Sequence, residues 1–292
     1  MARKAPLPDL VDLHTHSSAS DGVFPPREVV RQAKEMGLKA IAVTDHDTTA
    51  GTAEALAAGR EFGIEVIPGV EVSAEFEDGA CHVLGYFVDP DDAPLGALLV
   101  EARTGRDTRN TEIIHRLTVL GLPVTMAEVT GETEGGVVTR AHFARALLKR
   151  GYVKTWDEAF EKYLGRDRPA YVHRARLGPE DAIRGIRGAG GIAVLAHPRQ
   201  LNRGVAETGE WIDRLAKAGL DGVETQTPDH GANLMRHYQE AAARLGLIET
   251  GGTDWHGRDD VDVVLGLGTG GMIVHYAAVE RMKERLAARR IK

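Results

Sequence analysis

Two histidines stand one residue apart near the N-terminus, at the end of an apolar run. The stretch DLHTHSSASDG places His14 and His16 after that run and Asp21 five residues later. If residues 10–14 form a strand, its two-residue period points both imidazoles to one side. Imidazole is the commonest metal ligand among side chains, so this spacing is typical of a metal site. Such pairs also occur as solvated loop residues, and other segments must decide between the two.

Further ionisable side chains stand at or beside the ends of later apolar runs. These runs lie at 38–47, 64–73, 81–88, 191–198, 220–226 and 247–256. In a βα barrel, the carboxyl ends of the strands form a rim on which side chains from separate strands converge. With His14 and His16, the set holds six of the 12 histidines, which favours one convergent site over random scatter. Its other members are Asp45, His46, Glu71, His82, His197, Asp254 and His256.

Helical patterns fill several intervals between these runs. The segment 25–37 begins with two prolines, carries an apolar stripe at helical spacing and ends at Gly37. Helical patterns also cover 52–63, 207–219 and 231–245. Alternation of strand and helix predicts an α/β fold with a parallel sheet, either closed into a barrel or open.

The middle of the chain differs, because the strand rhythm stops at about residue 96 and helical patterns continue to about 175. Thr155 is expected to cap one of these helices, with Glu158 at the capping-box position. We therefore predict a barrel domain formed by residues 1–95 and 176–292. A helical insertion domain at 96–175, acting as a substrate lid, would interrupt it.

The composition is that of a globular protein, with 42% hydrophobic and 27% charged residues. No run of about 18 apolar residues exists, and the N-terminus lacks an apolar core, so neither a membrane span nor a signal peptide is expected. The single cysteine, Cys81, cannot form an internal disulfide, which agrees with a reducing compartment. These features predict a cytoplasmic location, and Cys81 is expected to be a packing residue.

Charge is distributed unevenly along the chain. The net charge is −7, which gives no global attraction to nucleic acid. Residues 101–176 nevertheless carry 14 Lys and Arg against 10 Asp and Glu, a net of +4 that leaves −11 on the remainder. The basic segment is either a binding surface for an anion or ordinary helix surface.

Six sequence blocks together carry a family resemblance. In chain order they are DLHTHSSASDG, TDHDTTAG, IPGVEVS, CHVLG, LAHP and GGTDWHG. They resemble the motifs of the PHP (polymerase and histidinol phosphatase) superfamily of metal-dependent phosphoesterases, over essentially the whole chain. TRAHFARALL and FEKYLGRDRPAYV further resemble the stand-alone branch that acts on nucleoside 3′,5′-bisphosphates and, in some members, on the 5′ ends of short RNAs.

The resemblance implies a distorted (β/α)7 barrel that holds two to three divalent metal ions. Many members have histidine where this chain has Asp21, so the third site is expected to differ in affinity or metal preference. The implied ligands form a first group of His14, His16, Glu71 and Asp254, a second that shares Glu71 and adds His82 and His197, and a third of Asp21, His46 and His256.

The ligand types agree with this resemblance. Six imidazoles and three carboxylates without thiolate suit Mn²⁺, our first choice, or Fe²⁺ or Zn²⁺, and disfavour an all-oxygen Ca²⁺ or Mg²⁺ cage. Glu71 could bridge two ions with its two oxygens, at the separation of about 3.5–4 Å used by two-metal phosphatases. We expect a hydroxide that bridges two metals to attack phosphorus in line, without a protein nucleophile.

Substrate choice is expected to depend on the basic insertion, because a phosphate remote from the reacting one needs arginine or lysine. Arg199 follows LAHP on the rim and could also reach a phosphate. A solvated position remains the alternative for Lys162, Arg168 and Arg199, and Tyr171 could stack on a base or close the core. The expected partner is a small anionic nucleotide or a short RNA 5′ end, not a DNA duplex or a membrane. The candidate binding residues are Arg140, His142, Lys162, Arg168, Tyr171 and Arg199.

Three acidic residues near the motifs have roles that the sequence leaves open. One of Asp45 and Asp47 could orient an imidazole, and Asp47 could instead cap a helix. Glu224, at another strand end, could enter the site or form a structural hydrogen bond. Four further histidines receive no role: His115, His230, His237 and His275.

Two other functions compete with nucleotide phosphoesterase activity. A small-metabolite phosphatase of the histidinol-phosphate type would share the barrel chemistry but has less reason for a basic insertion. A non-catalytic metal-binding module, like the domains fused to replicative polymerases, should have lost ligands. All nine implied ligands are present here, and 292 residues leave no room for a polymerase.

Overall fold

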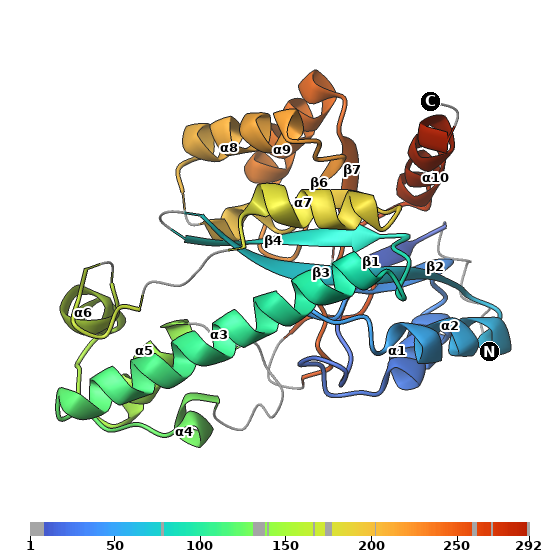
Figure 1. The fold of residues 1–292 in the computed structure, drawn as a ribbon. Helices are drawn as coiled ribbons and strands as arrows, with labels where there is room; N and C mark the ends of the chain where they lie inside the picture. The colour runs from blue at the N-terminus through green and yellow to red at the C-terminus, as the bar shows by residue number, and fades with distance from the viewer. Residues whose placement is uncertain are drawn as a thin grey trace. The chain divides into compact units, whose positions relative to one another are not determined.

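The computed structural model describes residues 9–76, 79–130, 138, 140–165, 167–172, 177–201, 203–258, 262–269 and 271–290 (Figure 1). The chain divides into two compact units, of which the first is Met1–Leu99 with Leu177–Lys292 and the second is Val100–Arg176. Among the described residues, no helix is both long and apolar enough to cross a membrane. The roles of the two units as metal-binding barrel and substrate lid stay predictions.

A seven-stranded sheet forms the centre of the first unit, with its strands hydrogen-bonded in chain order (Figure 1). Most neighbours are parallel, but β4 is antiparallel to both β3 and β5, so the expectation of a wholly parallel sheet is wrong there. Only two residues separate β3 from β4, which is too short for the crossover that a parallel pair needs. The strands are β1 Val11–Thr15, β2 Ala40–Val43, β3 Glu65–Phe76, β4 Gly79–Tyr86, β5 Ile192–Leu195, β6 Gly222–Gln226 and β7 Ile248–Gly251.

The two ends of this sheet approach each other. Thr15 in β1 forms a parallel bridge with Trp255, just after β7, and the His16 N–H donates to the Trp255 carbonyl at 2.8 Å. The chain passes so close here that a Cβ on Gly252 would lie 2.2 Å from the Cβ of His14. The mixed sheet is therefore nearly closed, which confirms the predicted α/β fold with a distorted seven-stranded barrel.

Helices of the first unit cover the sheet through apolar stripes. In α1, Pro26 occupies the first turn, and Val29, Val30 and Ala33 are fully buried against β2 and α2, as the sequence pattern predicts. Figure 1 shows α1 and α2 near β2, and α7 along β3 and β4. The helices are α1 Pro26–Glu35, α2 Thr52–Phe62, α7 Pro179–Gly188, the 3₁₀ turn η2 Pro198–Leu201, α8 Val205–Lys217, α9 Ala232–Leu245 and α10 Ala277–Arg290.

The second unit is helical and has its own core, which includes Phe143 and Leu147. Thr155 caps α6 by accepting the Glu158 N–H at 3.1 Å, which confirms the predicted N-cap. The Glu158 carboxylate accepts the Lys154 N–H at 2.6 Å, one residue before the partner that a capping box requires. The helices are α3 Ala93–Val119, which begins in the first unit, then α4 Met126–Thr130, α5 Arg140–Lys149, α6 Trp156–Ala159 and the π-helical turn η1 Phe160–Leu164.

Candidate metal centre

The nine ligand candidates lie in three strands, β1, β3 and β4, and in the loops that follow β1, β2, β5 and β7. His14 lies in β1, Glu71 in β3 and His82 in β4, and the imidazole of His14 and the carboxylate of Glu71 are fully buried. His197 and Asp254 follow β5 and β7, and both have positive φ, at 23° and 54°. Such backbone is costly for residues other than glycine and clusters at functional sites. The other candidates in loops or at strand ends are His16, Asp21, His46 and His256.

The structure brings these side chains together in three overlapping groups. In each group, one possible ligand atom per residue lies within 4.8 Å of all the others. The first group has the composition that the family resemblance implies. The third includes His16 in addition to the expected residues, and the second contains His46 in place of His197. The groups are His14, His16, Glu71 and Asp254; His46, Glu71 and His82; and His16, Asp21, His46 and His256.

Glu71 lies at the centre of this arrangement, because its two oxygens face different imidazoles. Oε1 is 2.8 Å from Nδ1 of His82 and 3.0 Å from Nε2 of His197. His197 therefore contacts Glu71 although it belongs to none of the three groups. Oε2 has three neighbours: Nε2 of His14 at 3.2 Å, Nε2 of His16 at 3.3 Å and Nδ1 of His46 at 3.1 Å.

Unsatisfied polar atoms test whether these residues fit a metal. Ten buried side-chain nitrogen or oxygen atoms of the described residues lack a hydrogen-bond partner, and seven of them belong to the candidate ligands. Buried polar atoms are normally paired, since leaving them unpaired costs free energy. Divalent cations would satisfy six of them, because the imidazole of His16 offers one lone pair and carries a proton on its other nitrogen, so the donor set fits a metal cluster. The seven atoms are Nε2 of His14, both ring nitrogens of His16, Nδ1 of His46, Oε2 of Glu71, Nδ1 of His82 and Oδ1 of Asp254.

The electrostatics follow from burying imidazoles against carboxylates. Burial lowers the pKa of His16, but the carboxylates of Asp254 and Glu71 that face its ring outweigh burial and raise that pKa to about 10. Burial raises the pKa of Glu71, but the neighbouring imidazoles hold it well below its usual range. Burial keeps the pKa of His46 well below the ordinary histidine value. Without a metal, the carboxylates are therefore ionised beside at least one charged imidazole.

Asp45 and Asp47 hold backbone around the site. Asp45 accepts the Ser17 N–H at 2.8 Å and the hydroxyls of Ser17 and Ser20 at 2.6 and 2.7 Å. These bonds fix the loop that carries Asp21. Asp47 accepts the Ser73 N–H at 2.7 Å. The helix-capping interpretation of Asp47 is wrong, because the N-cap residue of α2 is Gly51 and no side chain caps this helix.

Two residues at the site were missed in the sequence. Asp12 is fully buried and accepts the Thr253 N–H and hydroxyl at 3.0 and 2.6 Å, which holds the segment after β7 against β1. Its signal was an acidic residue inside an apolar strand, two positions before His14. Arg258 donates to the Asp21 carbonyl at 3.2 Å.

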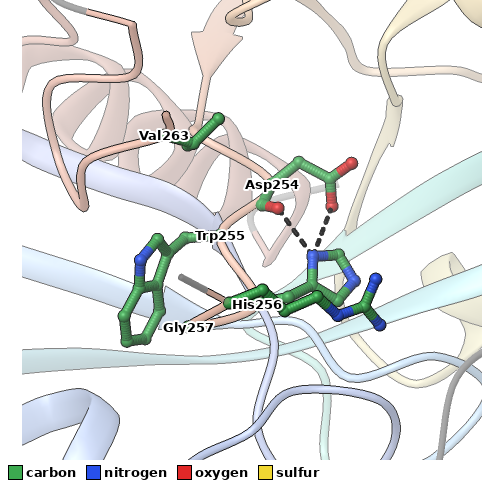
Figure 2. A pocket seen from close by; sticks show the side chains of 6 residues that line it. Asp254, Trp255, His256, Gly257 and Val263 are labelled. Atoms are coloured by element: carbon green, nitrogen blue, oxygen red, sulfur yellow. Dashed lines mark hydrogen bonds and ion pairs between the residues drawn. The ribbon is translucent and has the colours of Figure 1, made fainter. Parts of the chain in front are cut away.

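A small cavity of about 60 Å³ lies beside the third group (Figure 2). In Figure 2 the ring of His256 turns toward Asp254, and its Nδ1 is 2.7 Å from the Asp254 carbonyl and 3.8 Å from the carboxylate. Its Nε2 lies 3.0 Å from Asp21. The indole of Trp255 points the other way and stacks on Phe24 at 5.7 Å between ring centroids.

The candidate substrate residues of the second unit have different environments. The guanidinium of Arg140 lies 5.1 Å from the ring centroid of Tyr171, so these two are paired. His142 is half-buried on α5, and Arg168 is exposed. Lys162 forms an ion pair with Glu158 at 2.6 Å and its side chain is 58% exposed, which agrees with the solvated interpretation.

Arg199 lies in the first unit, two residues after His197. Its side chain is 57% exposed and its Nη1 is 3.9 Å from Asp229. It borders a hollow of about 480 Å³ on the barrel unit, together with Leu234 and Tyr238. His230, which received no role from the sequence, is buried close by and binds the Thr225 carbonyl through Nδ1 at 3.0 Å.

With this geometry, sequence comparison defines the class of protein. Residues 12–163 match the PHP domain family, and the chain belongs to it. The identification as a PHP-superfamily protein is confirmed.

Individual relatives show which members of this family the chain is similar to. The 5′-3′ exoribonuclease of Haemophilus influenzae is 39% identical over 84% of this chain and 89% of its own length. The 3′,5′-nucleoside bisphosphate phosphatase of Chromobacterium violaceum is 36% identical over 84% of this chain and 87% of its own. A crystal structure from Bifidobacterium adolescentis, described as a candidate metal-dependent phosphoesterase, is 30% identical, covers 96% and 98% of the two chains and gives a TM-score of 0.73.

Proposed function

We propose that this chain is a metal-dependent phosphoesterase that hydrolyses phosphate esters of nucleotides. The substrates would be nucleoside 3′,5′-bisphosphates, AMP-like mononucleotides or the 5′ ends of short RNAs. The observation that carries the proposal is the set of unpaired ligand atoms gathered around Glu71. Both curated relatives named above act on phosphate esters of nucleotides or RNA by their names, which supports the same chemistry here.

The proposed ligands are the nine residues named from the sequence. Bound divalent ions would supply an acidified water and stabilise charge on the phosphoryl oxygens. Glu71 would hold two ions together, because its oxygens face separate sets of imidazoles. Mn²⁺ is our first choice, with Fe²⁺ or Zn²⁺ as alternatives, since the donors mix nitrogen and oxygen without sulfur.

We assign the remote phosphate to basic residues outside the ligand set. Arg140 is the strongest candidate of the insertion, because its guanidinium can present two parallel N–H groups while the ring of Tyr171 supports it. His142 lies on the same helix. Lys162 and Arg168 are weaker candidates, and Arg199 would act from the barrel rim.

Phosphate release by the Mn²⁺-loaded protein tests the substrate class. Adenosine 3′,5′-bisphosphate, 5′-AMP, histidinol phosphate and a 5′-phosphorylated RNA trimer would be compared at equal concentration. We expect the highest kcat/KM for the bisphosphate or the trimer. A preference for histidinol phosphate would support the small-metabolite alternative, and release from none of them would support a non-catalytic metal-binding module.

Cellular location is part of the same proposal. A cytoplasmic enzyme is proposed because nucleotides and short RNAs are cytoplasmic substrates and the lone thiol, Cys81, is buried and free. Fractionation of cells that express the tagged chain would test this location.

A further inference from the structure

Glu224 is a buried carboxylate in the middle of β6 that belongs to none of the three ligand groups, so the sequence-based placement at a strand end is wrong. Its side chain is fully buried. Both of its oxygens lie 3.2 Å from Nδ1 of His14, and Oε2 also accepts the His197 N–H at 2.8 Å. A buried carboxylate is costly unless such partners compensate it. Both partners belong to proposed metal ligands, which indicates a role for Glu224 at the metal centre.

The two nitrogens of His14 face different surroundings. Nδ1 faces Glu224, whereas Nε2 lies 3.2 Å from Glu71 and 3.4 Å from Asp254, inside the first ligand group. A neutral imidazole carries one N–H and one lone pair. With the proton on Nδ1, the ring donates to Glu224 and directs its lone pair into the ligand group. The opposite tautomer would set a lone pair against the carboxylate and an N–H against the metal position.

We propose that Glu224 is a positioning residue that selects the Nδ1–H tautomer of His14 and holds its Nε2 lone pair toward the metal. This inference rests on the proposed function. The bond from the His197 N–H fixes Glu224 in turn, so one carboxylate links the strand ends that carry two proposed ligands. Carboxylates behind metal-bound histidines orient the ring and increase its basicity, and their loss typically costs about 10–100-fold in metal affinity.

Glutamine at this position separates the proposed role from simple filling of space. Glu224→Gln keeps the size of the side chain and removes one acceptor. If its oxygen keeps the His197 N–H, its NH₂ group faces Nδ1 of His14 and donates there, which favours the opposite tautomer. Glu224→Asp keeps the charge but is one methylene shorter, so it should recover part of the function.

Asp221→Asn is the matched control, since it removes a buried carboxylate just before β6. Asp221 is 1% exposed and pairs with arginines, away from the ligand groups. The Asp221→Asn variant should have a lower melting temperature and an unchanged affinity for metal. A purely structural role of Glu224 would give the same result.

Two measurements on the full chain test the proposal. Competition with a chelator gives the Kd for Mn²⁺ and Zn²⁺. ¹⁵N spectra of the histidine-labelled, Zn²⁺-loaded protein give the tautomer of His14, assigned by comparison with His14→Gln. We expect Glu224→Gln to raise the Kd by about tenfold or more and to remove the Nδ1–H signal, and Glu224→Asp to give intermediate values.

The outcomes distinguish the two levels of inference. A wild-type Kd and a retained Nδ1–H signal in Glu224→Gln would overturn the role of Glu224 alone. A lowered melting temperature with unchanged Kd, as in the control, would also overturn it. If the wild-type chain bound neither Mn²⁺ nor Zn²⁺, the proposed function would fail as well.

Discussion

At the residue scale, the candidate metal centre is built around one carboxylate, Glu71, whose two oxygens face five imidazoles. Glu71 is fully buried, and five histidine nitrogens lie within 3.3 Å of its oxygens. Burying these polar atoms away from water costs free energy. This cost in free energy is consistent with divalent cations that these donors would bind.

His16 and Asp254 provide the most direct substitutions. His16→Ala or Asp254→Asn should lower kcat by more than about 100-fold and reduce bound metal, since even partners behind the ligands are worth about 10–100-fold. Steady-state kinetics and elemental analysis would check both effects. His275→Ala is the control, because His275 is exposed and lies outside the ligand groups. Near-normal turnover in the two ligand variants would exclude these residues from the mechanism.

The thiol of Cys81 gives a separate test of burial. Burial raises its pKa to about 12, and Glu180 and Glu75 add to the shift. Since the thiolate is the reactive form, the native protein should react with a thiol reagent such as Ellman's reagent at pH 8 far more slowly than a free cysteine. One thiol should appear after addition of guanidinium chloride. Rapid reaction of the native protein would show that β4 is not packed as described.

The residues that the sequence predicted differ from those that it missed in how far along the chain their recognisable partners lie. Each ligand candidate belongs to a short sequence block that forms or follows a strand, so local pattern and the order of the blocks were enough to name it. Asp12 and Arg258 act on partners 241 and 237 positions away, which no local pattern contains. Glu224 was recognised only as one of two alternatives, because its contact with His14 spans 210 positions.

At the element scale, helix ends are tied together opposite the strand ends that carry the ligands. Asp221, just before β6, is surrounded by Arg187, Arg285 and Arg289. Each arginine also donates to a carbonyl that follows a helix, at Gly219 after α8, Gly246 after α9 and Gly191 after α7. Cations near helix carboxyl ends stabilise them. We therefore expect the cluster to contribute to the stability of the barrel and not to catalysis.

Asp221→Asn should therefore separate stability from activity. The variant loses charge-assisted hydrogen bonds worth about 1.5–3 kcal/mol, so its free energy of unfolding should fall by that order. Urea unfolding would measure the change, and kcat and KM at 25 °C should stay near the wild-type values. A large loss of kcat in the folded variant would contradict the structural role.

Strand direction was the element-level feature that the sequence did not predict. Alternating patterns predicted parallel strands, which holds for β1 with β2, β2 with β3 and β5 to β7. The apolar run of β4 looks like that of any buried strand, because composition does not record direction. The available signal was the short β3–β4 connection, because two residues are too few for the crossover that a parallel pair needs.

At the scale of the whole molecule, charge is divided between the two stretches of sequence. Residues 101–176 carry a net charge of +4 and the remainder about −11. Bound divalent cations and the basic insertion would both favour a substrate with more than one phosphate.

Arg140→Ala tests whether the insertion recognises the remote phosphate. Loss of one charge-assisted contact, about 1.5–3 kcal/mol, should raise KM for adenosine 3′,5′-bisphosphate by about tenfold or more. KM for an aryl phosphate, which has no second phosphate, should change little. Arg145→Ala on the same helix is the control, because Arg145 is exposed. Equal effects of Arg140→Ala on both substrates would remove it from the phosphate site.

The most direct test of the central claim is phosphate release from adenosine 3′,5′-bisphosphate while Mn²⁺ is returned to chelator-treated protein. We expect no release from the stripped protein, and a rate that rises with bound metal to a plateau at two to three ions per chain. An undiminished rate after complete removal of metal would contradict a metal-dependent phosphoesterase built around Glu71.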